Sequence, residues 1–324
     1  MRRLVTVLAT GALVAGMIGA CSDDDDGADG GSANETFKIG MANFTLGAPY
    51  FIGMSDAVKA QAEKSGRAEV VSTDARGDAT QLTTDVESLL AQNVDGIIIS
   101  GGPLESAPAA LNAIKQADKP VVLVDRKFAS GDYTSWIGPD NAAIGRQDGE
   151  YIVERLKGAG KLLVIKGGPA DNSIGLARTE GMLGVVSQQS GIEVVTAPAF
   201  GNWSSDGGLA VMEDMLAQHS DLSAVFCEND SMCLGAQKAI NDAGRSDDIF
   251  LAAVDGQKEA LKAIMDGTNF EVTGRNDSGE IGMKGLDRML EILDGKDVEK
   301  DTVLPSPRVT KENASEYYDP NSIF

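Results

Sequence analysis

Polar and aromatic side chains follow the expected strands of this chain at the points where those strands end. Carboxylates accept hydrogen bonds, guanidinium groups and amide nitrogens donate them, and aromatic faces cover apolar C–H groups. The set comprises Phe44, Tyr50 and Phe51 after the first expected strand, Asp125 and Arg126 after the fourth, and Asn229 and Asp255 after later strands. Because ligands of open α/β sheets bind outside the carboxyl ends of the strands, we expect these side chains to line one cleft.

Each of these residues also has a structural interpretation that needs no ligand. Asp125 and Arg126 could form an ion pair at the strand end, and Asn229 or Asp230 could cap the following helix. Aromatic side chains are more often core residues than ligand contacts. We expect Asp230 to be the cap, and we expect Trp136, which lies inside a short strand, to belong to the core.

The sequence does not predict an enzyme. Its one histidine, His219, sits at an expected helix end, where surface or capping roles are more common than general-base catalysis. The glycine-rich run 166–169 lacks the spacing and the Lys-Ser/Thr ending of a phosphate loop. The sequence contains neither a metal-ligand cluster nor a nucleophile elbow, so we expect no cofactor and no metal.

Short β-branched runs alternate with amphipathic segments and predict the elements that must position these residues. The expected strands are 37–42, 70–73, 96–100, 121–125, 162–165, 193–196, 224–226 and 249–254. The expected helices are 50–64, 80–92, 107–117, 142–157, 176–189, 205–218, 232–242, 258–265 and 281–293. Runs such as Ile97-Ile98-Ile99 are apolar without alternation, as strands covered on both faces should be. This order predicts an α/β fold with parallel sheets and right-handed crossovers.

Length, charge and cysteine usage narrow the class of protein further. The chain has 324 residues, which suits two domains better than one core. A net charge of −21 argues against a nucleic-acid partner, because phosphate backbones recruit stripes of Lys and Arg. Cys227 and Cys233 form an even pair that could be a disulfide or two buried thiols. Both remain open, since a strand-end residue and a first-turn helix residue can lie beyond the roughly 7 Å Cα limit for bridging.

The N-terminus has the features of an export signal followed by a tether. Arg2 and Arg3 precede an apolar run over 4–18, and Ile18-Gly19-Ala20-Cys21 resembles a bacterial lipobox. The resemblance implies a signal peptide over 1–20 and an acylated Cys21 that anchors the protein to a membrane. Residues 21–36 are acidic and contain no apolar residue larger than Ala before Phe37, so we expect a flexible tether there.

Several short motifs follow one another in a specific order. They are Pro49-Tyr50-Phe51, Asp125-Arg126, Gly138-Pro139-Asp140-Asn141, Arg178 with Gly181, Phe226 through Asn229-Asp230 to Leu234-Gly235, and Val254-Asp255-Gly256. This ordered set, which spans about residues 37–304, resembles the periplasmic sugar-binding proteins of ABC importers, specifically the ribose-binding-like group. The resemblance implies the type I periplasmic binding protein fold, in which two doubly wound parallel-sheet lobes are joined by a hinge of three segments.

The same resemblance implies lobe boundaries and roles for individual residues. The N-terminal lobe would comprise 37–139 and 277–305, and the C-terminal lobe 140–276 and 306–324. A ligand between the lobes would favour the closed form, because only there can both sides contact it. Tyr50 and Phe51 would form one aromatic wall and Trp203 the other. The implied polar set is Asp125, Arg126, Arg178, Asn229, Asp255 and Asn276, although Arg178 could instead be a solvated helix residue.

Two departures from the ribose pattern bear on the ligand. Ala48 replaces an Asn that often bonds the ligand, and Val254 replaces an aromatic residue, while Phe44 adds bulk nearby. These changes favour a deoxygenated sugar, a pentitol, a tetritol or another small polyol over ribose itself. The charges of two Asp and two Arg residues in the polar set cancel, which predicts a neutral ligand. Glu228 should contribute little to binding if it points away from the cleft.

The expected partners follow from this resemblance. The protein should be an extracytoplasmic, lipid-anchored monomer that delivers a small neutral sugar or polyol to an ABC permease. The alternative is a receptor for a sugar or sugar-like signal that reports to a chemoreceptor or a sensor kinase.

Overall fold

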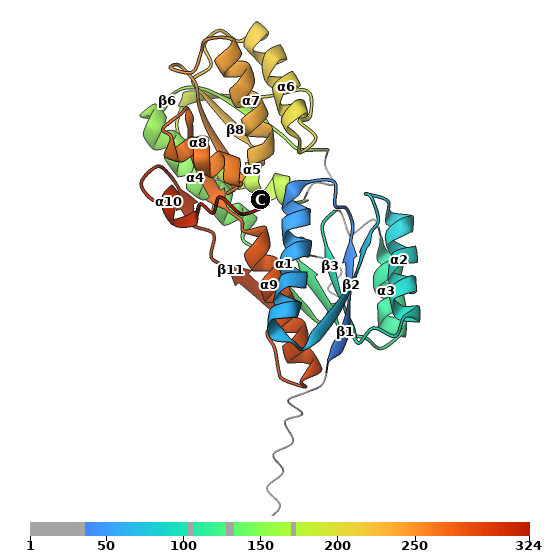
Figure 1. Cartoon of the computed structure of the whole chain (residues 1–324). Helices are drawn as coiled ribbons and strands as arrows, with labels where there is room; N and C mark the ends of the chain where they lie inside the picture. Colours follow the sequence, from blue (N-terminus) through green and yellow to red (C-terminus); the bar gives the residue numbers. More distant parts are fainter. Residues whose placement is uncertain (1–35, 103–106, 128–132, 170–172) are drawn as a thin grey trace, which may run out of the picture. The chain divides into compact units, whose positions relative to one another are not determined.

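Two six-stranded sheets form the centre of the protein. The computed structural model describes residues 36–102, 107–127, 133–169 and 173–324 (Figure 1). The first sheet has the order β11-β5-β4-β3-β1-β2. Its strands are β1 (Phe37–Asn43), β2 (Ala68–Asp74), β3 (Gly96–Ser100), β4 (Val121–Val124), β5 (Ser135–Pro139) and β11 (Asp301–Leu304). All neighbouring strands in this sheet run parallel.

The second sheet has the order β12-β10-β9-β8-β6-β7. Its strands are β6 (Ala159–Ile165), β7 (Gly191–Thr196), β8 (Ala224–Cys227), β9 (Phe250–Asp255), β10 (Phe270–Arg275) and β12 (Arg308–Val309). Pairing is parallel throughout except between β10 and β12, which run antiparallel. The predicted fold of two parallel-sheet α/β lobes is therefore confirmed, with one antiparallel edge strand added.

Helices cover both faces of each sheet. Around the first sheet lie α1 (Pro49–Ser65), α2 (Ala79–Ala91), α3 (Pro108–Gln116) and α9 (Ser278–Leu293). Around the second lie α4 (Asn141–Leu156), α5 (Ser173–Val186), α6 (Ser205–Gln218), α7 (Asp230–Asp242), α8 (Lys258–Met265) and α10 (Ala314–Tyr317). Figure 1 shows α1 and α9 on one side of the first sheet, and α2 and α3 on the other.

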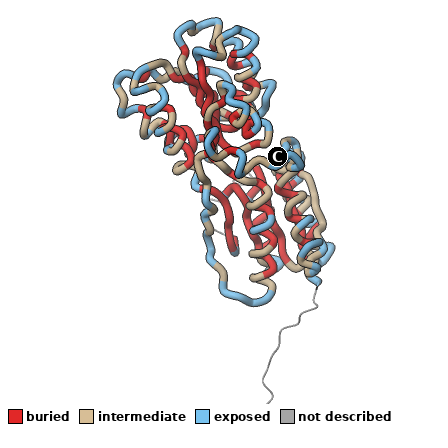
Figure 2. The backbone as a smooth tube through the Cα atoms, turned by 60° about the vertical axis from the view of Figure 1, so that its left-hand side comes forward, coloured by how far each residue is buried: buried red, intermediate tan, exposed pale blue. Residues whose placement is uncertain are grey.

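The buried residues divide in the same way, with one apolar cluster on each face of each sheet. On the first sheet, Met54 of α1 and Met289 of α9 share a cluster with Ile39, whereas Leu82 of α2 packs with Leu111 of α3 on the opposite face. The second sheet is covered by α4 and α5 on one face and by α6, α7 and α8 on the other. The central strands are accordingly buried, whereas the edge strands β2, β7 and β11 and the outer helix faces are more exposed (Figure 2). Apolar runs without alternation thus mark strands that are covered twice.

Three chain segments pass from one sheet to the other. They are 139–141 between β5 and α4, 275–278 between β10 and α9, and 304–308 between β11 and β12. The carboxyl ends of β4 and β9 lie close to these crossings, so their final residues are available to a site that uses both sheets. The exact lobe boundaries given above remain predictions.

The predicted signal peptide over 1–20, the acylated Cys21 and the tether over 21–36 fall almost entirely on residues 1–35, which lie outside the described residues. In the part of the chain that the structure describes, no helix is both long enough and apolar enough to cross a membrane.

Candidate functional site

Two aspartates lie at matching positions, one at the carboxyl end of a central strand in each sheet. Asp125 follows β4 and has φ of 68°, and Asp255 ends β9 with φ of 127°. Positive φ is uncommon outside glycine and is tolerated best by Asn and Asp. The indole Nε1 of Trp136 donates to the carbonyl oxygen of Asp125 at 3.1 Å and fixes that turn. Trp136 is a buried core residue, as the sequence predicted.

A continuous row of hydrogen bonds joins the two aspartates. The Tyr50 hydroxyl donates to Asp125 Oδ1 at 2.8 Å and accepts from Asn276 Nδ2 at 2.9 Å. Asn276 Nδ2 also approaches Asp255 Oδ1 at 3.2 Å. The Arg178 guanidinium closes the row with Nη2 at 2.8 Å from Asp255 Oδ1. Five of the residues singled out from sequence are therefore in one network.

Arg178 is the most heavily bonded member of this network. It is 2% exposed, so the alternative of a solvated helix residue is wrong. Besides its pairing with Asp255, Nε donates to Asn141 Oδ1 at 2.8 Å and Nη1 donates to the carbonyl oxygen of Glu228 at 2.6 Å. Gly145 makes room for it: a Cβ there would lie 2.0 Å from the Arg178 carbonyl oxygen, so only glycine lets α4 and α5 come this close.

Arg126 belongs to the first-sheet edge and makes a different contact. Its Nη1 donates to Ser173 Oγ at 2.7 Å, and Ser173 is the first residue of α5 on the other sheet. Among the ion pairs of the described residues there is none between Arg126 and Asp125, so the strand-end ion pair that the sequence left open is not formed. The Asp125 oxygen is bonded by Tyr50 instead.

Asn229 is the residue that caps α7. Its Oδ1 accepts from the Met232 backbone N–H at 3.0 Å, and its Nδ2 donates to the Trp203 carbonyl oxygen at 3.3 Å. The prediction that Asp230 is the cap is therefore wrong. Asp230 is fully buried and accepts from the Gln257 N–H at 2.7 Å and from the Thr273 hydroxyl at 2.8 Å. Asn229 has extended backbone angles, which a cap requires.

The four predicted aromatic contacts occupy distinct places. Phe44 is a core residue that lies against Gly102 and is 7% exposed. Phe51 packs against Gly101, and its ring meets that of Tyr50 edge-on, with centroids 5.2 Å apart.

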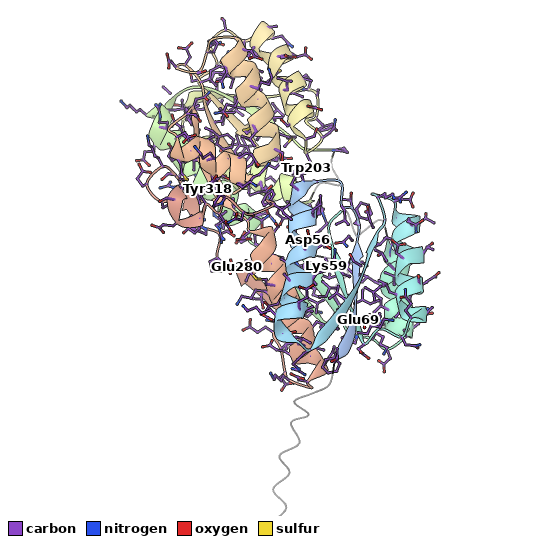
Figure 3. The ribbon with its side chains drawn as sticks, in the orientation of Figure 1. Asp56, Lys59, Glu69, Trp203, Glu280 and Tyr318 are labelled. Carbon is purple, nitrogen blue, oxygen red and sulfur yellow. A yellow bond between two sulfur atoms is a disulfide. The ribbon has the colours of Figure 1, made fainter. Side chains whose placement is uncertain are left out.

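Trp203 lies on the other lobe, in the segment that precedes α6 (Figure 3). It is half-buried, with φ of 57°, and lies so close to Gly167 that a Cβ there would approach the indole to 2.2 Å.

Glu228 is a buried residue next to the network whose contacts the sequence did not predict. It is 1% exposed, so it does not point into solvent. Its Oε2 accepts from the Gly167 N–H at 2.7 Å and its Oε1 from the Thr179 hydroxyl at 2.7 Å. Since its carbonyl oxygen holds Arg178, Glu228 ties three segments to the site. The sequence offered one indication of these contacts, which is that Glu228 lies between Cys227 and Asn229.

A disulfide joins Cys227 at the end of β8 to Cys233 in the first turns of α7, with Cα atoms 5.5 Å apart. The alternative of two free thiols is not what the structure has. The bridge encloses Glu228 and Asn229, which are the two residues that hold Arg178 and cap the helix. The disulfide therefore restrains the backbone from which the second-sheet edge of the site is built.

Burial shifts the protonation of the site carboxyls. It raises the pKa of Asp125, against the hydrogen bond from Tyr50 and the charges of Arg178 and Arg126. It raises the pKa of Asp255 to about 6, because the charge of Arg178 offsets only part of the desolvation. Burial, followed by the charge of Asp125, also raises the pKa of Tyr50 well above its ordinary value. The Tyr50 hydroxyl is therefore protonated and a donor at neutral pH.

The ionisable groups around the site serve hydrogen bonding, and the described residues contain no group of three or more His, Cys, Asp or Glu side chains arranged to hold a metal ion. A cavity of 620 Å³ lies beside Asp255, between α1, α9 and the segment 317–324. His219, the one histidine, is the C-terminal cap of α6, and its backbone N–H donates to the Met215 carbonyl oxygen.

The comparisons with known proteins agree with this geometry. A family model described as a periplasmic binding protein domain matches residues 39–297. The ribose import binding protein of Bacillus subtilis is 30% identical over 309 residues, which cover 94% of this chain and 98% of that protein. The xylitol-binding protein of Mycolicibacterium smegmatis is 26% identical over 312 residues, or 96% of this chain and 86% of that protein.

A solved structure gives the same result at the level of the fold. An ABC transporter solute-binding protein from Mycobacterium smegmatis, with bound glycerol, superposes with a TM-score of 0.82 and 30% identity, covering 89% of this chain and 98% of that one. The fold of two parallel-sheet α/β lobes is thus shared with this solved structure. The chain belongs to the periplasmic binding protein family, in its ribose-binding-like group.

Proposed function

We propose that this protein captures a small neutral sugar or polyol between its two lobes and delivers it, chemically unchanged, to an ABC importer. The observation that carries this proposal is the row of hydrogen bonds from Asp125 through Tyr50 and Asn276 to Asp255 and Arg178. Donors and acceptors alternate along it at the strand ends of both sheets, which suits a molecule whose hydroxyls both donate and accept. The bound glycerol of the similar solved structure and the names of the relatives support the same class of ligand.

Charge balance supports a neutral ligand. Asp125 and Asp255 are opposed by Arg126 and Arg178, and all four are less than a tenth exposed. An ionic ligand would need an excess of the opposite charge, because an unpaired buried charge costs several kcal/mol. In this assignment Tyr50, Phe51 and Trp203 contact the C–H faces, Phe44 limits the volume, and Asn229 and Asn276 add amide groups.

The family implies an extracytoplasmic location. We assign residues 1–20 to a lipoprotein signal peptide, Cys21 to the acylated N-terminus of the mature protein, and 21–36 to the tether that holds a monomer near its permease. Changing Cys21 to Ser should release the protein from membrane fractions or leave the precursor uncleaved. A wild-type protein that is wholly soluble and retains Met1 would contradict this assignment.

A thermal-shift screen against pentoses, hexoses, pentitols, tetritols and glycerol tests the ligand class. A ligand of this class should raise the melting temperature, and small-angle scattering should then show a smaller radius of gyration. Mass spectrometry of the released ligand should find it unchanged. A ligand recovered in altered form would reclassify the protein as an enzyme, and a response to charged solutes alone would overturn the proposal.

A further inference from the structure

The hydroxyl of Tyr50 makes the two hydrogen bonds that a ligand hydroxyl would be expected to make at this point. It donates to Asp125 Oδ1 at 2.8 Å, beyond the carboxyl end of β4, and accepts from Asn276 Nδ2 at 2.9 Å, just after β10 on the other sheet. A hydroxyl held between a carboxylate and an amide nitrogen satisfies both groups at once. The protein therefore supplies from its own side chain what a ligand could otherwise bring.

Neighbouring rings hold Tyr50 in this position. Phe51 contacts it edge-on at 5.2 Å between centroids with an interplanar angle of 89°, and Phe324 does so at 5.1 Å and 86°. If the ring swung away, Asp125 and Asn276 would lose partners while they remain buried, and unsatisfied buried polar groups are costly. The hydroxyl is thus a fixed part of the site.

Polar atoms near Tyr50 that are not hydrogen-bonded to it remain available to the ligand. Asn276 Oδ1 is buried and has no hydrogen-bond partner within the described residues. It is an acceptor at the site that a ligand hydroxyl can satisfy as a donor. The amide nitrogen of Asn276, in contrast, is already shared between Tyr50 and Asp255.

We propose that Tyr50 is a specificity-determining residue whose hydroxyl occupies the place of one ligand hydroxyl, so that the site takes a sugar or polyol that lacks a hydroxyl there. This inference rests on the proposed function and narrows its ligand class. A ligand with the additional hydroxyl must displace the Tyr50 oxygen, which already donates to Asp125 Oδ1 at that place. A ligand without that hydroxyl leaves both hydrogen bonds of the Tyr50 hydroxyl intact.

The substitution Tyr50→Phe tests this idea, because it removes one oxygen atom and keeps the ring and its edge contacts. It opens Asp125 and Asn276 to a hydroxyl from the ligand. The matched control is Tyr151→Phe, which removes a hydroxyl that donates to Glu271 Oε2 at 2.9 Å, on α4 and away from the site. Thermal unfolding of each variant checks that it folds.

The measurement is a calorimetric panel of pentoses and pentitols, each paired with its monodeoxy derivatives. For each pair, the ratio of the two dissociation constants is compared among wild type, Tyr50→Phe and Tyr151→Phe. For at least one pair, Tyr50→Phe should shift the ratio about tenfold or more toward the hydroxylated member, as expected for a gained hydrogen bond to a charged group. Tyr151→Phe should leave every ratio unchanged.

Two other results would distinguish a failure of the Tyr50 inference from a failure of the proposed function. If Tyr50→Phe weakened both members of every pair equally, or changed no ratio, the Tyr50 inference would be wrong and the proposed function would stand. If wild type bound no member of the panel, the proposed function would fail, and this inference with it.

Discussion

The two edges of the site are built differently, although each has an aspartate at the end of a central strand. At the second-sheet edge, Arg178 is bonded to Asp255, Asn141 and the Glu228 carbonyl, and a disulfide closes the segment behind it. At the first-sheet edge, Asp125 is bonded by a neutral hydroxyl among aromatic rings. The second edge is organised by buried charges that depend on one another, so changes there should affect folding and binding together. Changes at the first edge should mainly affect binding.

The largest expected effect is that of Arg178→Ala. Removing this guanidinium leaves Asp255 as a buried carboxylate without its cation, which should lower the free energy of unfolding by about 3–5 kcal/mol. Affinity for a sugar or polyol should fall by about 100-fold or more. The matched change at the first edge, Arg126→Ala, removes a hydrogen bond to Ser173 and should cost about 1–2 kcal/mol of stability. Urea denaturation measures both, and equal losses would remove the distinction between the edges.

Glu228→Ala should have the second-largest effect on stability. Two donors, the Gly167 N–H and the Thr179 hydroxyl, would be left without a buried acceptor, so the free energy of unfolding should fall by about 2–3 kcal/mol. Ligand affinity should fall too, because the Glu228 backbone positions Arg178. The control is Glu180→Ala on the exposed side of α5, which should change stability by no more than about 0.5 kcal/mol. If Glu228→Ala left the free energy of unfolding and the ligand affinity unchanged, the residues of the second edge would depend on one another less than their contacts indicate.

Removing the disulfide should have a smaller effect. The double change Cys227→Ser and Cys233→Ser opens a short loop, for which chain entropy predicts a loss of roughly 2 kcal/mol. Wild-type protein titrated under denaturing, non-reducing conditions should show no free thiol from this pair. Two free thiols would refute the bridge, and an unchanged ligand affinity in the double variant would confine its role to stability.

The pH dependence should be the mildest effect and should have opposite signs for stability and binding. The pKa of Asp255 is raised to about 6 in the folded protein, so its contribution to stability is complete below its unfolded pKa and declines as pH rises through about 6. Ligand affinity should instead rise over that interval, because ionised Asp255 accepts hydroxyl hydrogens. Between pH 5 and 7 we expect the free energy of unfolding to fall by about 1 kcal/mol and ligand binding to become more favourable by about 1 kcal/mol.

Asp255→Asn provides the control for this prediction. Calorimetry and urea denaturation across the same pH range should show both slopes reduced in the variant. Slopes that persist unchanged would assign the effect to the other buried carboxyls whose pKa is also raised, Asp125, Asp148 and Asp230.

Strand-end positions could be predicted from the sequence because they depend on local patterns. The run Ile97-Ile98-Ile99 identified β3, and Asp125, which follows β4, proved to share one network with Asp255, the last residue of β9. The sequence missed β10, β11, β12 and α10. The short edge strands β11 and β12 owe their conformation to pairing partners far away in the chain, so local pattern carries little signal for them.

The errors at the site have the same origin. Asn229 and Asp230 are equally good caps by residue type, and only the extended backbone at Asn229 decides between them. The contacts of Glu228 could not be predicted because its partners, Gly167 and Thr179, are remote in sequence. The sequence identified Tyr50 as an aromatic wall, whereas its hydroxyl bonds depend on two other segments that only the fold brings near.

The crossing of the chain between the sheets determines the order in which the two lobes can be completed. Five of the six strands of the second sheet lie in one continuous stretch, from β6 to β10. The first sheet lacks its edge strand until Asp301 of β11 reaches Trp136, and α9 brings Leu286 and Met289 to the cluster beneath α1 only shortly before. Such long-range pairings are slow to form. The lobe that emerges first from the ribosome therefore depends on segments from near the end of the chain, and truncations before residue 304 should expose its apolar core while leaving most of the second sheet able to assemble.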